Sequence, residues 1–181
     1  NYFRLRRKGT GMNVSSRLPV VLAVLVFALS QGYLVQLLHQ LRPSILFLQF
    51  TFEPARYWAI LEAWGSDGER AYREHFAYDF FHLFIYAACG RIVATRGALF
   101  APEACRLASI TAWLLPLAAV FDFAENLLQL HLLAGPVGVS SLLIPLSALC
   151  STLKWGLAAG FAGVIGWRLA RKWTQIGRLS R

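Results

Sequence analysis

Four long apolar segments alternate with polar stretches along the chain. Each is close to or above the roughly 20 residues that an α-helix needs to cross a hydrocarbon core of about 30 Å. The pattern predicts an all-α integral membrane protein, a four-helix bundle that forms a single transmembrane domain over residues 1–181. The expected spans are about 18–38, 76–95, 107–134 and 141–170.

The segment 39–75 is the one long hydrophilic stretch, and it contains five of the nine acidic residues. Its part from 47 to 64 is rich in aromatic side chains, which favour the headgroup region of a bilayer. We therefore expect a short amphipathic interfacial helix there. The Gly65-Ser66-Asp67-Gly68 stretch is expected to end it before the second span begins.

The first apolar segment has an alternative interpretation. Basic residues precede it, and Ala28-Leu29-Ser30 resembles a signal-peptide cleavage site, so the segment could be removed as a secretory signal. A retained span is favoured because the apolar character continues to Leu38, beyond a normal signal sequence. Residues 1–11 precede Met12, the only methionine, and are given no role in the fold.

Charge predicts the orientation. Lys and Arg gather before the first span, between the second and third, and after the fourth, whereas 135–140 has none. The positive-inside rule then places both termini in the cytoplasm and 39–75 outside, in a cell membrane of the bacterial inner or plasma type. The net charge of +9 is interpreted as contact with anionic membrane lipids. Nucleic-acid binding is not expected, because the basic residues flank apolar runs.

The apolar spans contain polar side chains at helical spacing. On the third span they occur at i, i+3, i+4 and i+7, so they share one face. Charged groups at the centre of a bilayer are costly and must face protein or water. The candidate pocket residues are Asp79, His82 and Tyr86 on the second span, Asp122, Glu125, Asn126 and Gln129 on the third, and Lys154 on the fourth.

Depth indicates which of these groups meet. Counted from the outer ends of their spans, Asp122 and Lys154 both lie about 18 to 20 Å deep and are expected to form an ion pair. Asp79 is expected only about 5 Å deep. Together these residues predict an acidic cleft that opens outward. Because three acids face one lysine, at least one carboxyl is expected to be protonated, with Glu125 as the candidate.

Metal and cofactor chemistry is not expected. The three cysteines are far apart and lie in or beside apolar stretches, which is typical of small buried side chains. His82 is interpreted as a hydrogen-bond partner within the bundle and not as a metal or haem ligand.

A motif in the second and third spans resembles a group of small bacterial four-helix membrane proteins whose activity is unknown. The resemblance covers about residues 60–130, and it rests on Gly68-x-x-x-Tyr72, Asp79, Tyr86 and Asp122-Phe123-Ala124-Glu125-Asn126. The chain also has a distant likeness to the sterol-isomerase and sigma-2 receptor group. That likeness implies acids in a bundle that contact a lipophilic ligand, and it assigns no catalytic residue here.

Three functions fit the pattern. The first is a pocket that binds a lipid or another lipophilic small molecule; as an enzyme, it would catalyse proton transfer of the isomerase type. The second is a proton or cation pathway, because relays are built from acids at successive depths. The third is an accessory subunit whose polar faces pack against a membrane-protein partner.

Overall fold

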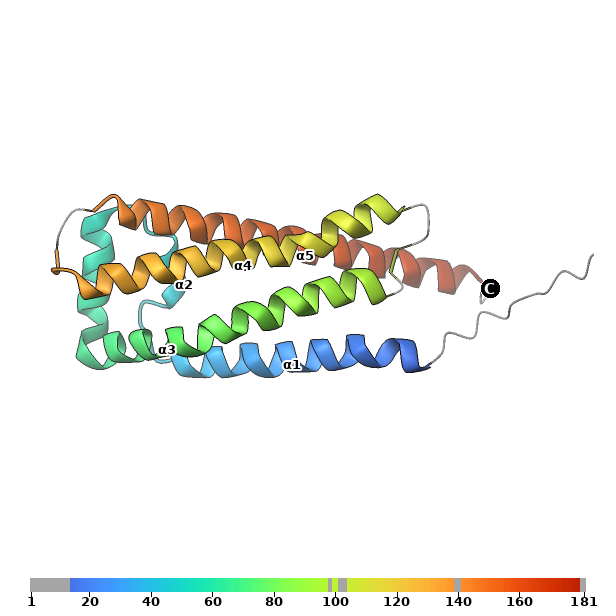
Figure 1. Cartoon of the computed structure of the whole chain (residues 1–181), viewed down its shortest axis with the longest axis horizontal. Coiled ribbons are helices and arrows are strands. Elements are labelled where there is room, and N and C mark those ends of the chain that lie inside the picture. The colour runs from blue at the N-terminus through green and yellow to red at the C-terminus, as the bar shows by residue number, and fades with distance from the viewer. Residues whose placement is uncertain (1–13, 98, 101–103, 139–140, 180–181) are drawn as a thin grey trace, which may run out of the picture.

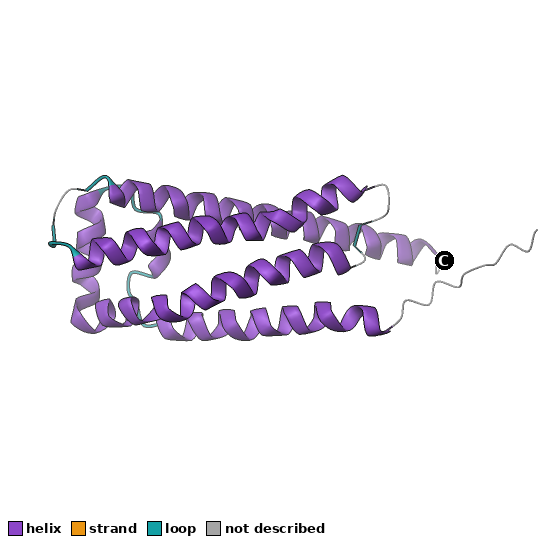
Figure 2. Cartoon of the chain, viewed as in Figure 1, coloured by secondary structure: helices purple, strands orange, loops and turns teal. Residues whose placement is uncertain are grey.

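A computed structural model describes residues 14–97, 99–100, 104–138 and 141–179 (Figure 1). The regular structure of these residues is entirely helical (Figure 2). Four helices are long and apolar enough to cross a membrane, as the sequence predicts. The elements are α1 (Val14–Leu38), α2 (Ile45–Gln49), α3 (Pro54–Arg96), α4 (Cys105–Ala134) and α5 (Leu143–Leu179).

Helix α3 begins much earlier than the predicted second span. It bends at Gly65, whose φ of 64° and ψ of −174° are not helical. Residues 54–64 lie across one end of the bundle, and the rest of α3 turns to run beside the other helices (Figure 1). Helical structure extends to residues before 76, the predicted start of the span, although the apolar character of the sequence stops there. The polar turns are supported on their solvent side by pairs such as Arg73–Glu69, at 2.7 Å.

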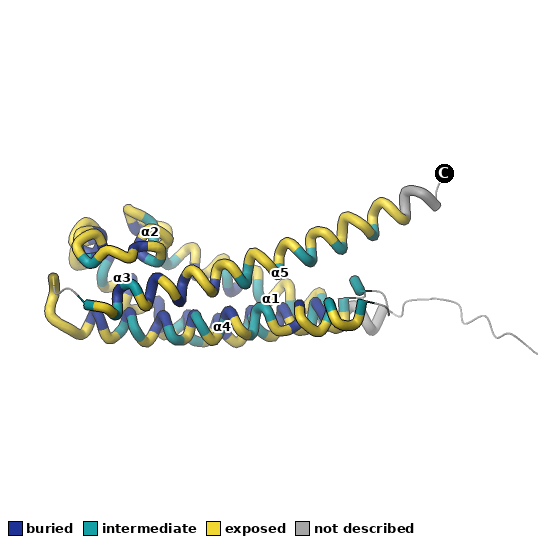
Figure 3. The backbone as a smooth tube through the Cα atoms, turned by 90° about the horizontal axis from the view of Figure 1, so that it is seen from above, coloured by how far each residue is buried: buried dark blue, intermediate teal, exposed yellow. Residues whose placement is uncertain are grey.

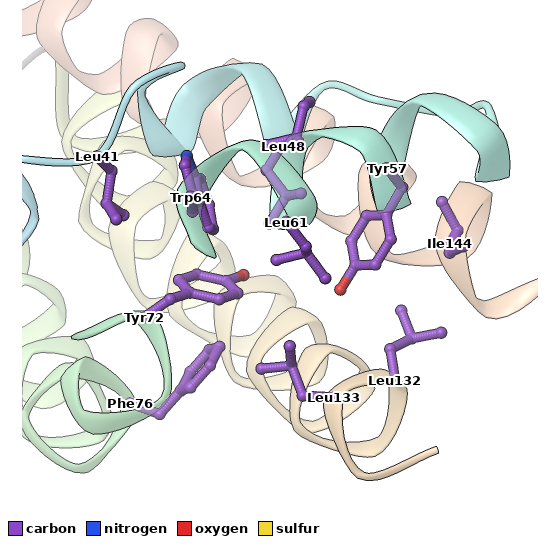
Figure 4. Close-up of a cluster of buried hydrophobic side chains, with 11 residues drawn as sticks. Leu41, Leu48, Tyr57, Leu61, Trp64, Tyr72, Phe76, Leu132, Leu133 and Ile144 are labelled. Carbon is purple, nitrogen blue, oxygen red and sulfur yellow. The ribbon is translucent and has the colours of Figure 1, made fainter. Parts of the chain in front are cut away.

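The predicted interfacial helix over 47–64 is two helical pieces, α2 and the first part of α3. They are separated at 50–53, and Pro54 begins the second piece, a position where its missing N–H is not needed. The aromatic residues are not all anchors at a surface, since Tyr57 is fully buried. Figure 4 shows how the two pieces pack on the bundle through a cluster of Leu41, Leu48, Tyr57, Ile60, Leu61, Trp64, Tyr72, Phe76, Leu132, Leu133 and Ile144.

The long helices pack in a row. Helix α3 packs against α1 on one side and α4 on the other, and α4 packs against α5. Helix α3 approaches α4 closely at Gly90, where a Cβ atom would lie 2.6 Å from the side chain of Leu115. Among the described residues, α1 and α5 are not packed along each other. The short helix α2 bridges them at one end, where Trp155 Nε1 donates to Gln49 Oε1 at 3.1 Å.

The outward faces of the long helices are apolar. Large exposed side chains include Leu29 on α1, Phe84 on α3 and Val120 on α4, while the buried positions face the neighbouring helices (Figure 3). Helix α5 diverges from the others and continues to Leu179, past the predicted limit of 170. The start of α1 and the end of α5 lie at the same end of the bundle (Figure 1), and α2 and the first part of α3 lie at the opposite end.

Candidate functional site

All eight candidate residues are buried, although they are polar. They come from the three helices that the sequence indicated: α3 provides Asp79, His82 and Tyr86, α4 provides Asp122, Glu125, Asn126 and Gln129, and α5 provides Lys154. Seven of them form three clusters, and His82 contacts α1 instead.

Lys154 is the centre of the deepest cluster. Its Nζ donates to Asp122 Oδ1 at 2.7 Å and lies 2.6 Å from Glu125 Oε2. The predicted Asp122–Lys154 ion pair is therefore confirmed. Glu125 also reaches Lys154, because i and i+3 side chains on α4 lie on the same face.

The two carboxyl groups differ in their hydrogen bonds. Asp122 also accepts from the hydroxyl of Tyr86 at 3.0 Å, so it joins α3 to α5. Glu125 Oε2 forms an ion pair with Lys154, and among the described residues it makes no hydrogen bond of regular geometry. With both acids ionised, the group of Asp122, Glu125 and Lys154 carries a net charge of −1 in a buried place.

Asp79 is deeper than its predicted 5 Å. Its Oδ2 accepts from Asn126 Nδ2 at 2.6 Å, which places it level with Asn126, eight residues before the end of α4 at Ala134. The depth estimate failed because it counted from residue 76, whereas helical structure along the bundle starts just after Gly65, about ten residues earlier.

Gln129 belongs to a third cluster near the end of the bundle that carries α2. Its Oε1 accepts from the hydroxyl of Tyr57 at 2.6 Å, and its Nε2 donates to Ser147 Oγ at 2.8 Å. All three side chains are buried. This cluster fastens the transverse part of α3 to α4 and α5, a structural role that its satisfied hydrogen bonds account for.

His82 connects α3 to α1. Its Nδ1 lies 2.7 Å from Ser30 Oγ, which also accepts from the hydroxyl of Tyr78 at 3.0 Å. The imidazole stacks on Phe27 with ring centroids 5.9 Å apart. Tyr78 was not among the residues that the sequence indicated. Its position four residues before His82 places it on the same face of α3, and this spacing could have indicated it.

A cavity of about 460 Å³ lies between α1 and α5. Helices α3 and α4 also line it, and residues 38–49 line one end. Of the candidates, His82, Tyr86, Asp122 and Lys154 line it, and we call these four residues the floor. Asp79, Glu125, Asn126 and Gln129 do not line it. The wall is mostly apolar, with Phe27, Leu34, Val35, Leu38, Ile45, Leu46, Leu115, Ala118, Trp155 and Ala158.

The cavity combines apolar walls with a few converging polar groups, which is how proteins bind small amphiphilic molecules. Among the described residues, no group of three or more His, Cys, Asp or Glu side chains is arranged to hold a metal ion. The floor supplies hydrogen-bonding and charged groups to this cavity.

Comparisons with protein-family models, with curated proteins and with solved structures find no significant match to this chain. The resemblance seen in the second and third spans stays a prediction, and the functional argument rests on the site.

Proposed function

We propose that this chain is a multi-pass membrane protein with both termini in the cytoplasm. Support comes from four helices of sufficient length and apolarity and from the apolar outward faces of those helices. In water such faces would be large exposed hydrophobic patches, whereas lipid covers them at no cost. The basic residues Arg91, Arg96, Arg106, Arg168, Arg171 and Lys172 lie toward the end where α1 starts, as the positive-inside rule expects.

The chain offers a direct test of this orientation. Cys105 is exposed at the start of α4, whereas Cys89 and Cys150 are buried. A Val137→Cys variant in a Cys105→Ser background places a thiol in the exposed loop at the other end. In intact bacterial spheroplasts, a membrane-impermeant maleimide should label the Val137→Cys variant and leave Cys105 of the parent unlabelled. After permeabilisation both should react. The opposite pattern refutes the orientation, and labelling of both in intact cells refutes the membrane assignment.

We propose further that the cavity between α1 and α5 binds a lipid or another amphiphile. The observation that supports this most is the floor: a mostly apolar cavity of about 460 Å³ reaches a buried ion pair, a tyrosine and a histidine. Apolar walls hold an apolar body, and the floor offers hydrogen bonds to a polar group of the ligand. A ligand between α1 and α5 would be accessible from the lipid, because these helices are not packed along each other.

The other two functions have less support. A proton pathway needs linked groups along the bundle, and Asp79 with Asn126 forms a pair apart from the Lys154 cluster in the hydrogen bonds described above. An accessory subunit would turn its polar faces outward toward a partner. Here the polar side chains of α3, α4 and α5 contact one another inside the chain.

Filling the cavity tests the binding proposal. Ala158 lines the cavity, and its neighbour Ala159 is exposed and does not. An Ala158→Trp variant should lose the lipophilic molecules that co-purify with the parent, measured by mass spectrometry of extracts from the purified proteins. The Ala159→Trp variant adds the same side chain on the outside and should retain them. Equal retention by both variants, or no enriched molecule with the parent, would refute a binding cavity.

A further inference from the structure

The cavity has polar groups at two places, and they differ in charge. The floor carries Asp122 and Lys154, which are paired with each other. The end lined by residues 38–49 carries Arg42. Among the described residues that line the cavity, Asp122 is the only carboxylate, so no acid of the lining neutralises Arg42. We call the end that carries Arg42 the rim. The cavity thus has a cationic rim and a floor whose charged groups are paired with each other.

The rim arginine is held in place by the backbone. Arg42 Nη1 donates to the carbonyl oxygens of His39 at 2.6 Å and Leu41 at 2.9 Å. Both bonds use the same nitrogen of the guanidinium. The other nitrogens stay available to bind a carboxylate or a phosphate in the fork geometry that suits these anions. A guanidinium fixed in this way loses less freedom when an anion binds, which favours binding.

The spacing of the two places follows from α1. Ser30 contacts His82 of the floor, so it marks the floor level on α1. Leu38 ends the helix next to the rim, eight residues later. At the helical rise this separation is about 12 Å. An extended chain advances roughly 1.2 Å per bond, since a residue of three bonds spans at most about 3.6 Å. About ten bonds therefore separate the rim from the floor.

The size of the cavity suits a ligand with one chain. Its volume of about 460 Å³ lies in the lower part of the range of about 300–1,000 Å³ that is typical of small-molecule sites. A lipid with two full acyl chains is much larger. A slender molecule with a single chain of ten to twelve carbons and a polar group at each end has the right size.

We propose that the cavity selects a single-chain amphiphile with an anionic group bound at Arg42 and a hydrogen-bonding group, such as a hydroxyl, at the floor. This inference rests on the proposed binding function and names the ligand class. The anionic end pairs with the guanidinium, the apolar chain lies along the walls of α1 and α5, and the hydroxyl bonds to the side chains of the floor. Molecules that lack either polar end leave one of the two places without its partner.

Four matched probes test the proposal: 12-hydroxydodecanoate, dodecanoate, dodecane-1,12-diol and 1-dodecanol. Their chains have the same length, and the first carries both polar ends. Affinities are measured with the full chain in lipid nanodiscs, by competition against radiolabelled 12-hydroxydodecanoate. We expect 12-hydroxydodecanoate to bind at least about tenfold more tightly than each probe that lacks one end, since a hydrogen bond to a charged group contributes at least that much.

Two variants test whether the rim binds the carboxylate end of the ligand and the floor binds its hydroxyl end. Arg42→Gln should weaken binding of both carboxylates about tenfold or more and leave the diol and the alcohol unchanged. Arg56→Gln is the matched control, because Arg56 is exposed in the same hydrophilic segment and does not line the cavity. Tyr86→Phe, which keeps the ring and removes a floor hydroxyl, should reduce the preference for 12-hydroxydodecanoate over dodecanoate.

The outcomes separate this inference from the proposed function. Equal binding of all four probes, or an Arg42→Gln variant that keeps the parent's preferences, overturns the two-ended ligand while a binding cavity stands. If none of the probes binds more tightly to the parent than to Ala158→Trp, the inference fails. In that case, retention of co-purified lipids by Ala158→Trp would refute the proposed function as well.

Discussion

Replacing Lys154 by glutamine should destabilise the protein strongly. The lysine is the single cation within 2.7 Å of two carboxyl groups, and the exposed fractions of the Lys154, Asp122 and Glu125 side chains are 9%, 8% and 2%. Loss of one partner of a buried ion pair typically costs about 3–5 kcal/mol, because a charge stays buried without compensation. If the contacts acted only as hydrogen bonds between membrane helices, the cost would be about 0.6 kcal/mol. We expect a loss of at least about 3 kcal/mol in the free energy of unfolding.

Denaturant titration of the protein in detergent micelles measures this loss, and two further variants interpret it. Arg70→Gln removes a cation from an exposed pair with Asp67, at 2.8 Å, and should cost less than about 1 kcal/mol. The triple variant Asp122→Asn, Glu125→Gln, Lys154→Gln leaves no buried charge and should be more stable than Lys154→Gln alone. A loss below about 1 kcal/mol for Lys154→Gln, or a triple variant that is no more stable than it, would refute a stability dominated by buried charge.

Substitutions of Gly65 and Gly90 test the geometry of α3 by the same titration, and Gly160 on α5 provides a control for Gly65. Gly65→Ala should destabilise the protein by about 1–3 kcal/mol, because φ of 64° with ψ of −174° is a conformation essentially limited to glycine. Gly160→Ala, at a helical position with open space around it, should instead be neutral or stabilising by up to about 1 kcal/mol. Equal effects of these two variants would contradict the bend. Gly90→Ala should cost about 1–3 kcal/mol, because the added carbon would approach Leu115 to 2.6 Å. No change in stability for Gly90→Ala would mean that α3 and α4 lie farther apart.

Hydrophobic periodicity and length predicted the helices, and helical spacing predicted the central part of the site. Asp122 and Glu125 are on one face because they are three residues apart. Lys154 was placed at the depth of Asp122 by counting residues along α4 and α5 from the short loop that joins these two helices. That count was reliable because α4 and α5 begin and end close to the predicted limits near their shared loop.

The same count failed for Asp79, because polar turns before residue 76 stay helical and hydropathy does not detect them. The order in which the helices pack could not be predicted either, because it depends on how the whole faces of neighbouring helices fit together. The cavity follows from that order. So does the role of Arg42, which lies far from the polar stripes in sequence and lines the cavity only because α2 crosses from α1 to α5.

The place of α1 in the row bears on how the chain is processed in the cell. Removal of a signal peptide after Ser30 would take away Phe27, which lines the cavity and stacks on His82, and Ser30, which contacts His82 Nδ1. In the mature protein, His82 would then lack the two α1 side chains that contact it. Cleavage after Ser30 and the floor as described are therefore mutually exclusive. The mass of the mature protein decides between them before any ligand is added.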